Sequence, residues 1–170
     1  MSDAALRGLL DRAAISDVVH AYATGLDRRD WALYRSIFTD SIEMEFSSVG
    51  LRSGTYQADE WVRSAQTLFA GFSATQHTSS NHVHELRGDA ATCVSNMQAE
   101  HFVAREPGDG LDGPDADRWT IGGFYRNELV RRSDGWKLKR VALLVTWSRG
   151  NPEVSRIALK RGRALGAGGR

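Results

Sequence analysis

The spacing of hydrophobic residues changes near residue 74, and this change restricts the possible folds more than any other feature of the sequence. Before residue 74, apolar side chains recur every three or four positions, as on the buried face of a helix. After it, polar and apolar side chains alternate, as in strands with one buried face. Helices followed by a run of long strands predict an α+β domain with the helices on one face of a sheet.

The N-terminal part of the chain is predicted to be mainly helical. We expect helices at about residues 4–28, 31–38 and 57–72, a strand at 41–46, and a turn with a short partner strand at 50–54. One broad apolar face of the first helix is formed by residues spaced at threes and fours, namely Leu6, Leu9, Leu10, Ala13, Ala14, Val18, Tyr22 and Leu26.

The C-terminal part is predicted to be a sheet of long strands. They are expected at about residues 75–87, 91–105, 118–132 and 135–148, joined by hairpin turns at 87–89 and 133–135. Residues 106–117 are rich in glycine and proline and are predicted to form a loop. A short helix from Asn151 to about Arg163 and a loose tail from Gly166 to Arg170 complete the chain.

Strands of this length are expected to curl around a helix. The sequence therefore predicts an α+β cone or barrel, in which N-terminal helices pack on a long, curved, mixed or antiparallel sheet that encloses a pocket. No repeat or linker divides the sequence. We expect one domain over residues 1–170, with a core at about 6–150 and a C-terminal helix and tail at 151–170.

Composition excludes several classes of protein. Hydrophobic residues make up 41% and charged residues 25% of the 170 residues, values typical of a packed globular domain. The formal charge of +1 gives no field that would attract nucleic acid or an acidic membrane. A single cysteine, Cys93, rules out an internal disulfide. The N-terminus lacks the pattern of a signal peptide, so we expect a soluble cytoplasmic protein without nucleic-acid or membrane partners.

Asp27 is placed where helix electrostatics disfavours an acid. It lies in the last turn of the first predicted helix, where the helix dipole destabilises a carboxylate by a few tenths to about 1 kcal/mol. It also continues the buried row of Ile15, Val19 and Ala23 at a spacing of four. An acid at the end of an apolar row requires a partner elsewhere in the fold.

Two histidines are candidates for that partner. His101 shares its strand face with Cys93, Met97 and other apolar residues, so we expect it to face the core or pocket. The face of His77 is harder to predict because the strand that it opens is polar on both faces.

Several short sequence pieces occur in a recognisable order. They are Leu26-Asp27-Arg28-Arg29-Asp30-Trp31, Gln76-His77-Thr78, His101, Gly122-Gly123-Phe124-Tyr125 and Asp134-Gly135-Trp136-Lys137. With this ordered set, the chain resembles the SnoaL-like branch of the nuclear-transport-factor-2-like α+β cone superfamily over about residues 6–150. Within that family it looks most similar to scytalone dehydratase, bile-acid 7α-dehydratase and the lindane dehydrochlorinase.

The resemblance implies roles for four residues. In those enzymes a helix-end Asp and a strand His form a dyad in which the His removes a proton from the substrate, and these positions correspond to Asp27 and His77. A second pocket His of scytalone dehydratase corresponds to His101, and a pocket Tyr of the bile-acid enzyme corresponds to Tyr22.

The sequence also departs from the family pattern at several positions. Two pocket tyrosines of scytalone dehydratase correspond to Leu26 and Phe46, so their water-holding hydroxyls are absent here. A late-strand Arg of the bile-acid enzyme corresponds to Val145. These departures argue against the substrates of those two enzymes while leaving the dyad intact.

The chemistry of the candidate residues agrees with proton abstraction. Imidazole has an ordinary pKa of about 6.5, and a carboxylate partner raises it and fixes which ring nitrogen carries the proton. His101 or Tyr22 is expected to act as the acid. Tyr125 and Asn127, which share a strand face with Trp119, are expected to line the pocket together with Phe46 and Met97.

The sequence thus predicts a cofactor-independent dehydratase-like lyase acting on a small hydrophobic cyclic molecule. A polyketide cyclase, a ketosteroid-isomerase-like isomerase, and a non-catalytic domain like the small subunits of ring-hydroxylating dioxygenases remain alternatives on the same scaffold. A homo-oligomer, either a dimer or a trimer, is expected because a long sheet leaves one large face to cover.

Each candidate residue also has an ordinary structural interpretation. Asp27 could be a solvated turn acid, His77 a plain strand histidine, and His101 and Tyr22 satisfied core residues. His82 and His84 point the same way from a strand, but no further ligand with suitable spacing is evident, so no metal site is predicted. Cys93 is interpreted as a small core residue.

Overall fold

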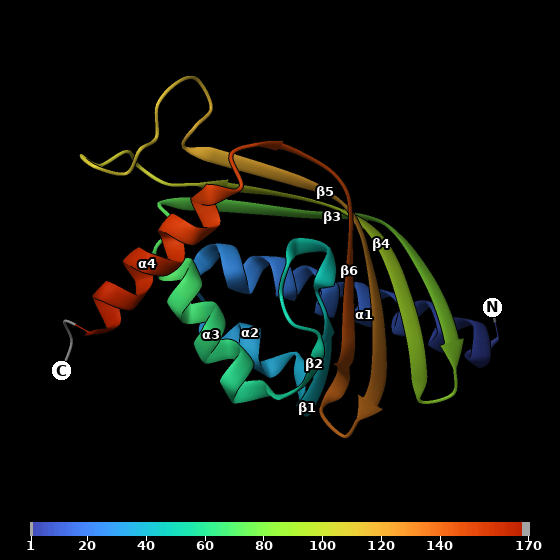
Figure 1. Ribbon diagram of the computed structural model, residues 1–170. Coiled ribbons are helices and arrows are strands. Elements are labelled where there is room, and N and C mark those ends of the chain that lie inside the picture. Colours follow the sequence, from blue (N-terminus) through green and yellow to red (C-terminus); the bar gives the residue numbers. More distant parts are fainter. Residues whose placement is uncertain (1, 168–170) are drawn as a thin grey trace.

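The computed structural model describes residues 2–167 and contains an α+β fold (Figure 1). The described residues form the α-helices α1 (Asp3–Arg28), α2 (Trp31–Ser36), α3 (Ala58–Ala70) and α4 (Glu153–Ala167). They also form the strands β1 (Phe38–Glu45), β2 (Gly54–Gln57), β3 (Ala74–Arg87), β4 (Ala90–Phe102), β5 (Arg118–Arg132) and β6 (Gly135–Gly150), and a short 3-10 helix at Ser47–Val49.

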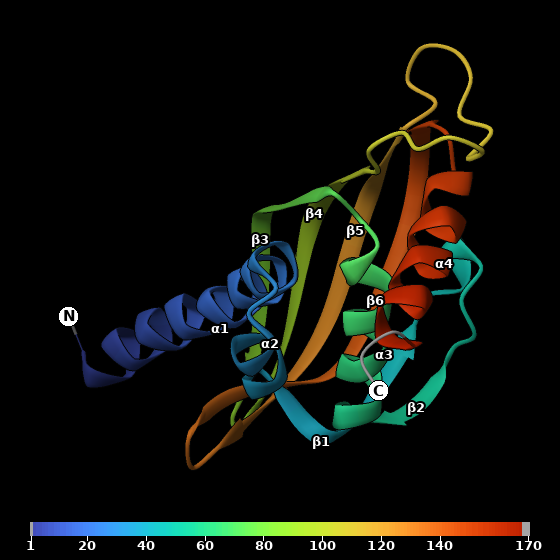
Figure 2. The ribbon, with the colours of Figure 1, turned by 90° about the vertical axis from the view of Figure 1, so that its left-hand side faces the viewer.

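The six strands form one sheet in the order β2-β1-β6-β5-β4-β3. All neighbouring pairs are antiparallel except β1 and β6, which run parallel, so the sheet is mixed. It curves strongly without closing into a barrel, and α1, α2 and α3 lie within its concave side (Figures 1 and 2). The predicted α+β cone is therefore confirmed, with an open sheet in place of a closed barrel.

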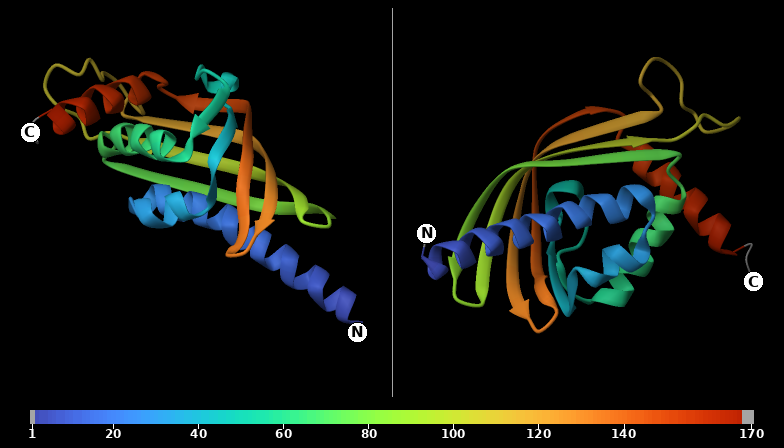
Figure 3. Two further views of the ribbon diagram at one scale, coloured as in Figure 1. Left: turned by 90° about the horizontal axis from the view of Figure 1, so that it is seen from below. Right: turned by 180° about the vertical axis from the view of Figure 1, so that it is seen from behind.

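Helix α1 crosses beneath the sheet along its concave face (Figure 3). Its buried side contains Ile15, Val19, Tyr22 and Leu26, as the sequence predicted. The N-terminal turns project beyond the sheet (Figure 2), and three leucines predicted to be part of the apolar face are exposed instead, namely Leu6, Leu9 and Leu10. None of the described helices is both long and apolar enough to cross a membrane.

Several predicted boundaries were wrong. The second helix ends at Ser36 and not at Phe38, because Phe38 is buried against Tyr22 and Tyr34 and already opens β1. Strand β1 therefore begins earlier than predicted, and β4 ends at Phe102 rather than near residue 105.

The predicted C-terminal tail was also partly wrong. Helix α4 continues past Arg163 to Ala167, so it includes the start of the segment expected to be a loose tail. Residues 168–170 lie outside the described part of the chain.

A β-bulge in β3 changes which side chains face α1. The pairing of β3 with β4 shifts between Ser80 and Val83, and Asn81 has a positive φ of 54°. Before the bulge, His77 is on the less exposed face of the strand, and after it His82 and His84 are. Strict alternation would have placed His82 and His84 on the opposite face from His77. The bulge therefore brings His77, His82 and His84 to the same side of the strand.

A buried acid joins α1 to the far end of the sheet. Both carboxylate oxygens of Asp11 accept hydrogen bonds from Arg131 of β5, at 2.7 and 2.6 Å. Trp136 of β6 donates a third at 3.2 Å, and its ring lies under the Arg131 guanidinium at 4.4 Å. The bonds from Arg131 lower the pKa of Asp11 despite its burial. Asp11 thus links the N-terminal half of α1 to β5 and β6.

We predict that Asp11→Ala destabilises the fold by about 2 kcal/mol, because it removes charge-assisted hydrogen bonds that have no substitute. Because its pKa is lowered in the folded state, Asp11 contributes stability above the pKa of an unfolded Asp and loses it as pH falls below that value. Urea unfolding at pH 7 and at pH 3 measures both effects. The matched control is Asp89→Ala, which removes an exposed partner of the same arginine and should cost less than about 1 kcal/mol. Equal losses in the two variants would contradict the assignment.

Candidate active site

Asp27 and His77 form a close hydrogen-bonded pair between the end of α1 and the start of β3. The carboxylate Oδ1 lies 2.7 Å from His77 Nδ1, and Oδ2 accepts a hydrogen bond from the backbone N–H of His77 at 2.6 Å. Thr75 donates its hydroxyl to Oδ1 at 2.9 Å. These bonds supply the partner that the position of Asp27 at the helix end requires.

Helix α1 ends just after Asp27 because Arg29 leaves the helical conformation. Its backbone has a φ of 57°, and its N–H still bonds to carbonyls of the last helical turn. The Arg29 side chain donates to the carbonyl of Leu26 at 2.6 Å and to the Thr75 hydroxyl at 2.9 Å. Arg29 therefore caps the helix and also bonds to Thr75, the residue whose hydroxyl donates to the Asp27 carboxylate. The sequence signal that was missed is a basic residue immediately after the last helical turn.

The second helix fixes the direction in which α1 ends. Gly25 lies against Tyr34, and a Cβ atom at Gly25 would stand 2.9 Å from the Cβ of Tyr34. Only a residue without a side chain lets α2 pack this closely. Asp30 then caps α2 by accepting from Leu33 N–H at 2.9 Å, as its position in the sequence predicted.

The electrostatics of the pair fix the tautomer of His77. Burial opposes ionisation of Asp27, but the hydrogen bonds from His77 and Thr75 outweigh it and lower the pKa of the carboxyl group. An ionised carboxylate only accepts hydrogen bonds, so Nδ1 of His77 carries a proton. The other nitrogen, Nε2, then holds a free lone pair in the neutral ring. This is the form in which a histidine acts as a base.

His101 is buried on the core-facing side of β4, as predicted. Its ring lies edge-on to His77 at 5.5 Å between centroids and also contacts Phe72 and Trp119. Burial and the charge that His77 can carry lower the pKa of His101 to about 4. Because Nδ1 lies 3.2 Å from the carbonyl of Trp119, which only accepts, the single proton of the neutral ring is on Nδ1.

Three tyrosines form a cluster beside the dyad. Tyr22 of α1 lies 5.1 Å from Tyr34 and 5.6 Å from Tyr125, measured between ring centroids. Burial raises the pKa of Tyr22 and of Tyr125 well above the ordinary value, so both hydroxyls stay protonated. Trp61 donates to the Tyr34 hydroxyl at 3.0 Å. Tyr34, which the sequence analysis did not single out, thus supports the two predicted pocket tyrosines.

A small cavity of about 10 Å³ lies between α1 and the sheet, next to His77 and the tyrosines. It is lined by Val19, Tyr22, Ala23, His77, Thr78, Ser79, Met97, Gln98, Tyr125, Asn127 and Val141. This volume holds about one water molecule. The predicted pocket residues Tyr22, Met97, Tyr125 and Asn127 therefore meet at one place.

Three predicted site residues, Phe46, His101 and Asp27, do not line this cavity. Phe46 packs against Trp61 of α3, at 5.5 Å between ring centroids. The ring of His101 lies instead among those of Phe72, His77 and Trp119. Asp27 contacts Nδ1 of His77, the position from which a carboxylate can orient the base.

Residues 7–142 match the SnoaL-like domain family. The chain belongs to this family. No curated protein matches the chain. The predicted resemblance is therefore confirmed at the level of the family and its fold.

Several solved structures superpose well on the chain. The Kfla4162 protein from Kribbella flavida is 34% identical, with a TM-score of 0.80 over 88% of this chain and 99% of that one. A hexachlorocyclohexane dehydrochlorinase, LinA-type3 from Novosphingobium barchaimii, is 20% identical, with a TM-score of 0.67 over 85% and 92%. A candidate scytalone dehydratase from Novosphingobium aromaticivorans is 21% identical, with a TM-score of 0.70 over 85% and 94%. The two more distant structures share the fold.

We predict that His101 makes the folded state less stable as the solution becomes acidic. Its folded pKa of about 4 is below the value of about 6.5 in an unfolded chain, so the unfolded state binds the extra proton between these pH values. Stability should fall by up to about 3 kcal/mol from pH 6.5 to pH 4 on this account.

Urea unfolding of the wild type and of His101→Gln across this pH range tests the effect. The variant should show a flatter dependence of unfolding free energy on pH, whatever its absolute stability. The matched control is His20→Gln, at an exposed histidine of α1. The same slope in wild type and His101→Gln would show that the burial of this ring does not control its protonation.

Proposed function

We propose that the protein is a lyase that removes a proton from a small hydrophobic cyclic substrate and eliminates water or another leaving group. The observation that carries the proposal is the 2.7 Å contact between Asp27 and His77, together with the position of His77 in the cavity wall. Membership of the SnoaL-like family supports it, since structures with this fold include proteins named as a dehydrochlorinase and a candidate dehydratase.

His77 is the base of the proposed reaction. Its Nε2 takes a proton from a substrate carbon, the C–H electron pair forms a double bond to the neighbouring carbon, and the leaving group departs with the electrons of its bond. The imidazolium that forms is stabilised by the Asp27 carboxylate, which is already ionised and hydrogen-bonded to Nδ1. Such an elimination requires a base and a leaving group, so we propose that it proceeds without a cofactor.

The tyrosines supply the proposed hydrogen-bond donors. Tyr22 and Tyr125 line the cavity and stay protonated, so either can donate to the leaving group or to an oxygen that gains negative charge. Met97 provides apolar contact and Asn127 a polar one on the same wall.

His101 has a different role from the acid that the sequence suggested. At neutral pH its one proton is directed to the carbonyl of Trp119, which leaves none on the other ring nitrogen for a leaving group. We propose instead that His101 packs edge-on against the His77 ring and keeps it in position. Tyr22 is then the better candidate for the acid.

The tight cavity has a consequence for binding. A cyclic substrate is far larger than one water molecule, so it can enter only if side chains in the wall move. The ring of Phe69, at the end of α3, lies 5.8 Å from that of His77 between centroids, and the Arg29 guanidinium lies over the Phe69 ring at 5.3 Å from its centroid. Movement of this helix end would open a path to the base.

A proton-transfer isomerase or a cyclase on the same scaffold is the second candidate. The observation in its favour is the pair of protonated tyrosines beside the base, because hydrogen-bond donors of this kind stabilise an enolate without any leaving group. A third candidate, a non-catalytic domain, is favoured by the small volume of the cavity. Product analysis separates the first two, since only elimination releases water or halide.

We predict that His77→Ala lowers kcat/KM for elimination by about 10²–10⁴-fold, because it removes the general base. The assay uses a panel of cyclic compounds with chloride or hydroxyl on the carbon next to an acidic C–H, and follows released halide or the absorbance of the new double bond. Asp27→Asn should also lower kcat, since an amide cannot stabilise the imidazolium as a carboxylate does.

Gln76→Ala is the control, at the exposed neighbour of His77 on the opposite side of β3. It should turn over substrate like the wild type. Unchanged turnover in a folded His77→Ala protein, checked by circular dichroism, would overturn the proposal.

We predict that Tyr22→Phe reduces kcat more than it changes KM, because the hydroxyl acts on charge that develops during the reaction. A loss of about 10-fold or more is expected if it protonates the leaving group. Tyr125→Phe is the companion variant, since both hydroxyls face the same cavity. If both variants keep wild-type kcat, neither tyrosine is the acid.

A further inference from the structure

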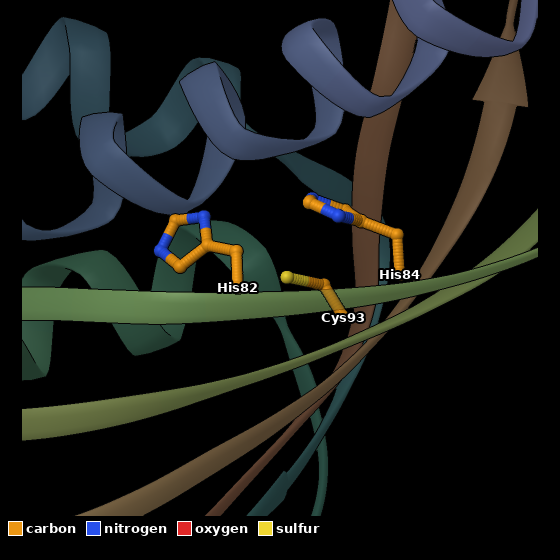
Figure 4. Close-up of side chains that lie close together, drawn as sticks. All are labelled: His82, His84 and Cys93. Carbon is orange, nitrogen blue, oxygen red and sulfur yellow. The ribbon is translucent and has the colours of Figure 1, made fainter.

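Three metal-ligand side chains converge between the sheet and α1, away from the dyad. His82 and His84 extend from β3 beyond its bulge, and Cys93 extends from β4, where it is paired in register with His84. Figure 4 shows the Cys93 sulfur pointing into the space between the two imidazoles, beneath helix α1. Residues 11 positions apart in sequence are thus brought together by one hairpin.

The distances suit a single bound ion. One nitrogen of each imidazole and the Cys93 sulfur all lie within 4.8 Å of one another. A tetrahedral Zn²⁺ has Zn–N bonds of about 2.0 Å and Zn–S bonds of about 2.3 Å, which places its ligand atoms roughly 3.5 Å apart. Small side-chain rotations close that gap, since His82 and His84 are only partly buried.

We propose that His82, His84 and Cys93 form a binding site for a thiophilic divalent cation such as Zn²⁺. The donor set decides the class of metal, because imidazole and thiolate ligands suit zinc, whereas Mg²⁺ and Ca²⁺ require several oxygens. The site is independent of the proposed elimination, since neither Asp27 nor His77 belongs to it.

Helix α1 contributes the surroundings of this site. The Ser16 hydroxyl lies 2.9 Å from a ring nitrogen of His82 and 2.9 Å from one of His84. Ser79 contacts the other nitrogen of His82 at 3.0 Å. These hydroxyls orient both rings. Both nitrogens of His82 have a serine contact, so His82 must release one of them to bind a metal, whereas Nδ1 of His84 has no serine contact. Hydrogen bonds of this kind are typical supports of histidine ligands.

His20 lies beside the three clustered side chains without belonging to the cluster in its present rotamer. It follows Ser16 by one helical turn on α1, and its ring centroid lies 4.8 Å from that of His82. A structural zinc site has four protein ligands, and a Cys–His₃ set would result if the His20 ring turned toward the ion. The metal would then link α1, β3 and β4 at one point.

The bulge at Asn81 is the reason that the three ligands meet. Cys93 is on the inner face of β4 by ordinary alternation and is fully buried. His82 and His84 reach the same side only because the register of β3 shifts after Ser80. The histidine pair is visible in the sequence, but Cys93 cannot be recognised there as the third proposed ligand, because the spacing alone does not show strand pairing across the hairpin.

Titration of metal-free, full-length protein with Co²⁺ tests the proposal. We expect saturation at one ion per chain, with the near-ultraviolet absorption of a thiolate–Co²⁺ bond and the visible bands of tetrahedral Co²⁺, both abolished by one equivalent of Zn²⁺. Zn²⁺ should also raise the unfolding temperature. His82→Ala and His84→Ala should each weaken binding at least 10-fold, and His20→Ala should change the visible bands while the thiolate band remains.

The thiolate band should disappear in Cys93→Ala while circular dichroism shows a folded protein. If this buried substitution prevents folding, the double variant His82→Ala/His84→Ala carries the same test through its loss of Co²⁺ binding. The matched control is His77→Ala/His101→Ala, which removes two histidines elsewhere in the sheet and should keep the thiolate band. Absence of saturable binding in the wild type, Co²⁺ binding without the thiolate band, or binding unchanged in the His82→Ala/His84→Ala variant would each overturn the proposed site.

Discussion

The hydrogen bonds that β3 gives to the Asp27 carboxylate are the interaction on which the site depends. They offset the unfavourable position of an acid at a helix C-terminus, and they fix the end of α1 against the start of β3. The same bonds orient the imidazole of His77. One small set of contacts therefore stabilises the junction of helix and sheet and also defines the base, so changes that move α1 relative to β3 must alter both.

Much of the fold follows from local patterns in the sequence. The period of hydrophobic residues located the helices and the four long strands, and the misplacement of Asp27 on an apolar row indicated a buried partner before any contact was known. The interior position of His101 followed from strand alternation. These features could be predicted because they depend on neighbours within a few residues along the chain.

Other features depend on contacts between distant residues and were missed for that reason. Nothing local shows that Asp11 meets Arg131, which is 120 residues away, or that Phe38 leaves α2 to enter the core beside Tyr22. The bulge near Asn81 reverses the inward face of β3, and the alternation rule has no means of detecting it. The final volume of the cavity is set by side-chain packing among α1, β4 and β5, which spacing cannot give.

The position of β3 at the end of the strand order has a further consequence. One of its sides carries backbone groups without a neighbouring strand among the described residues, and such an edge invites another chain to add a strand. The bulge interrupts the regular ladder halfway along this edge and so protects against edge-to-edge aggregation. The irregularity that turns His82 and His84 inward thus also makes the free edge of β3 a poorer template for an added strand.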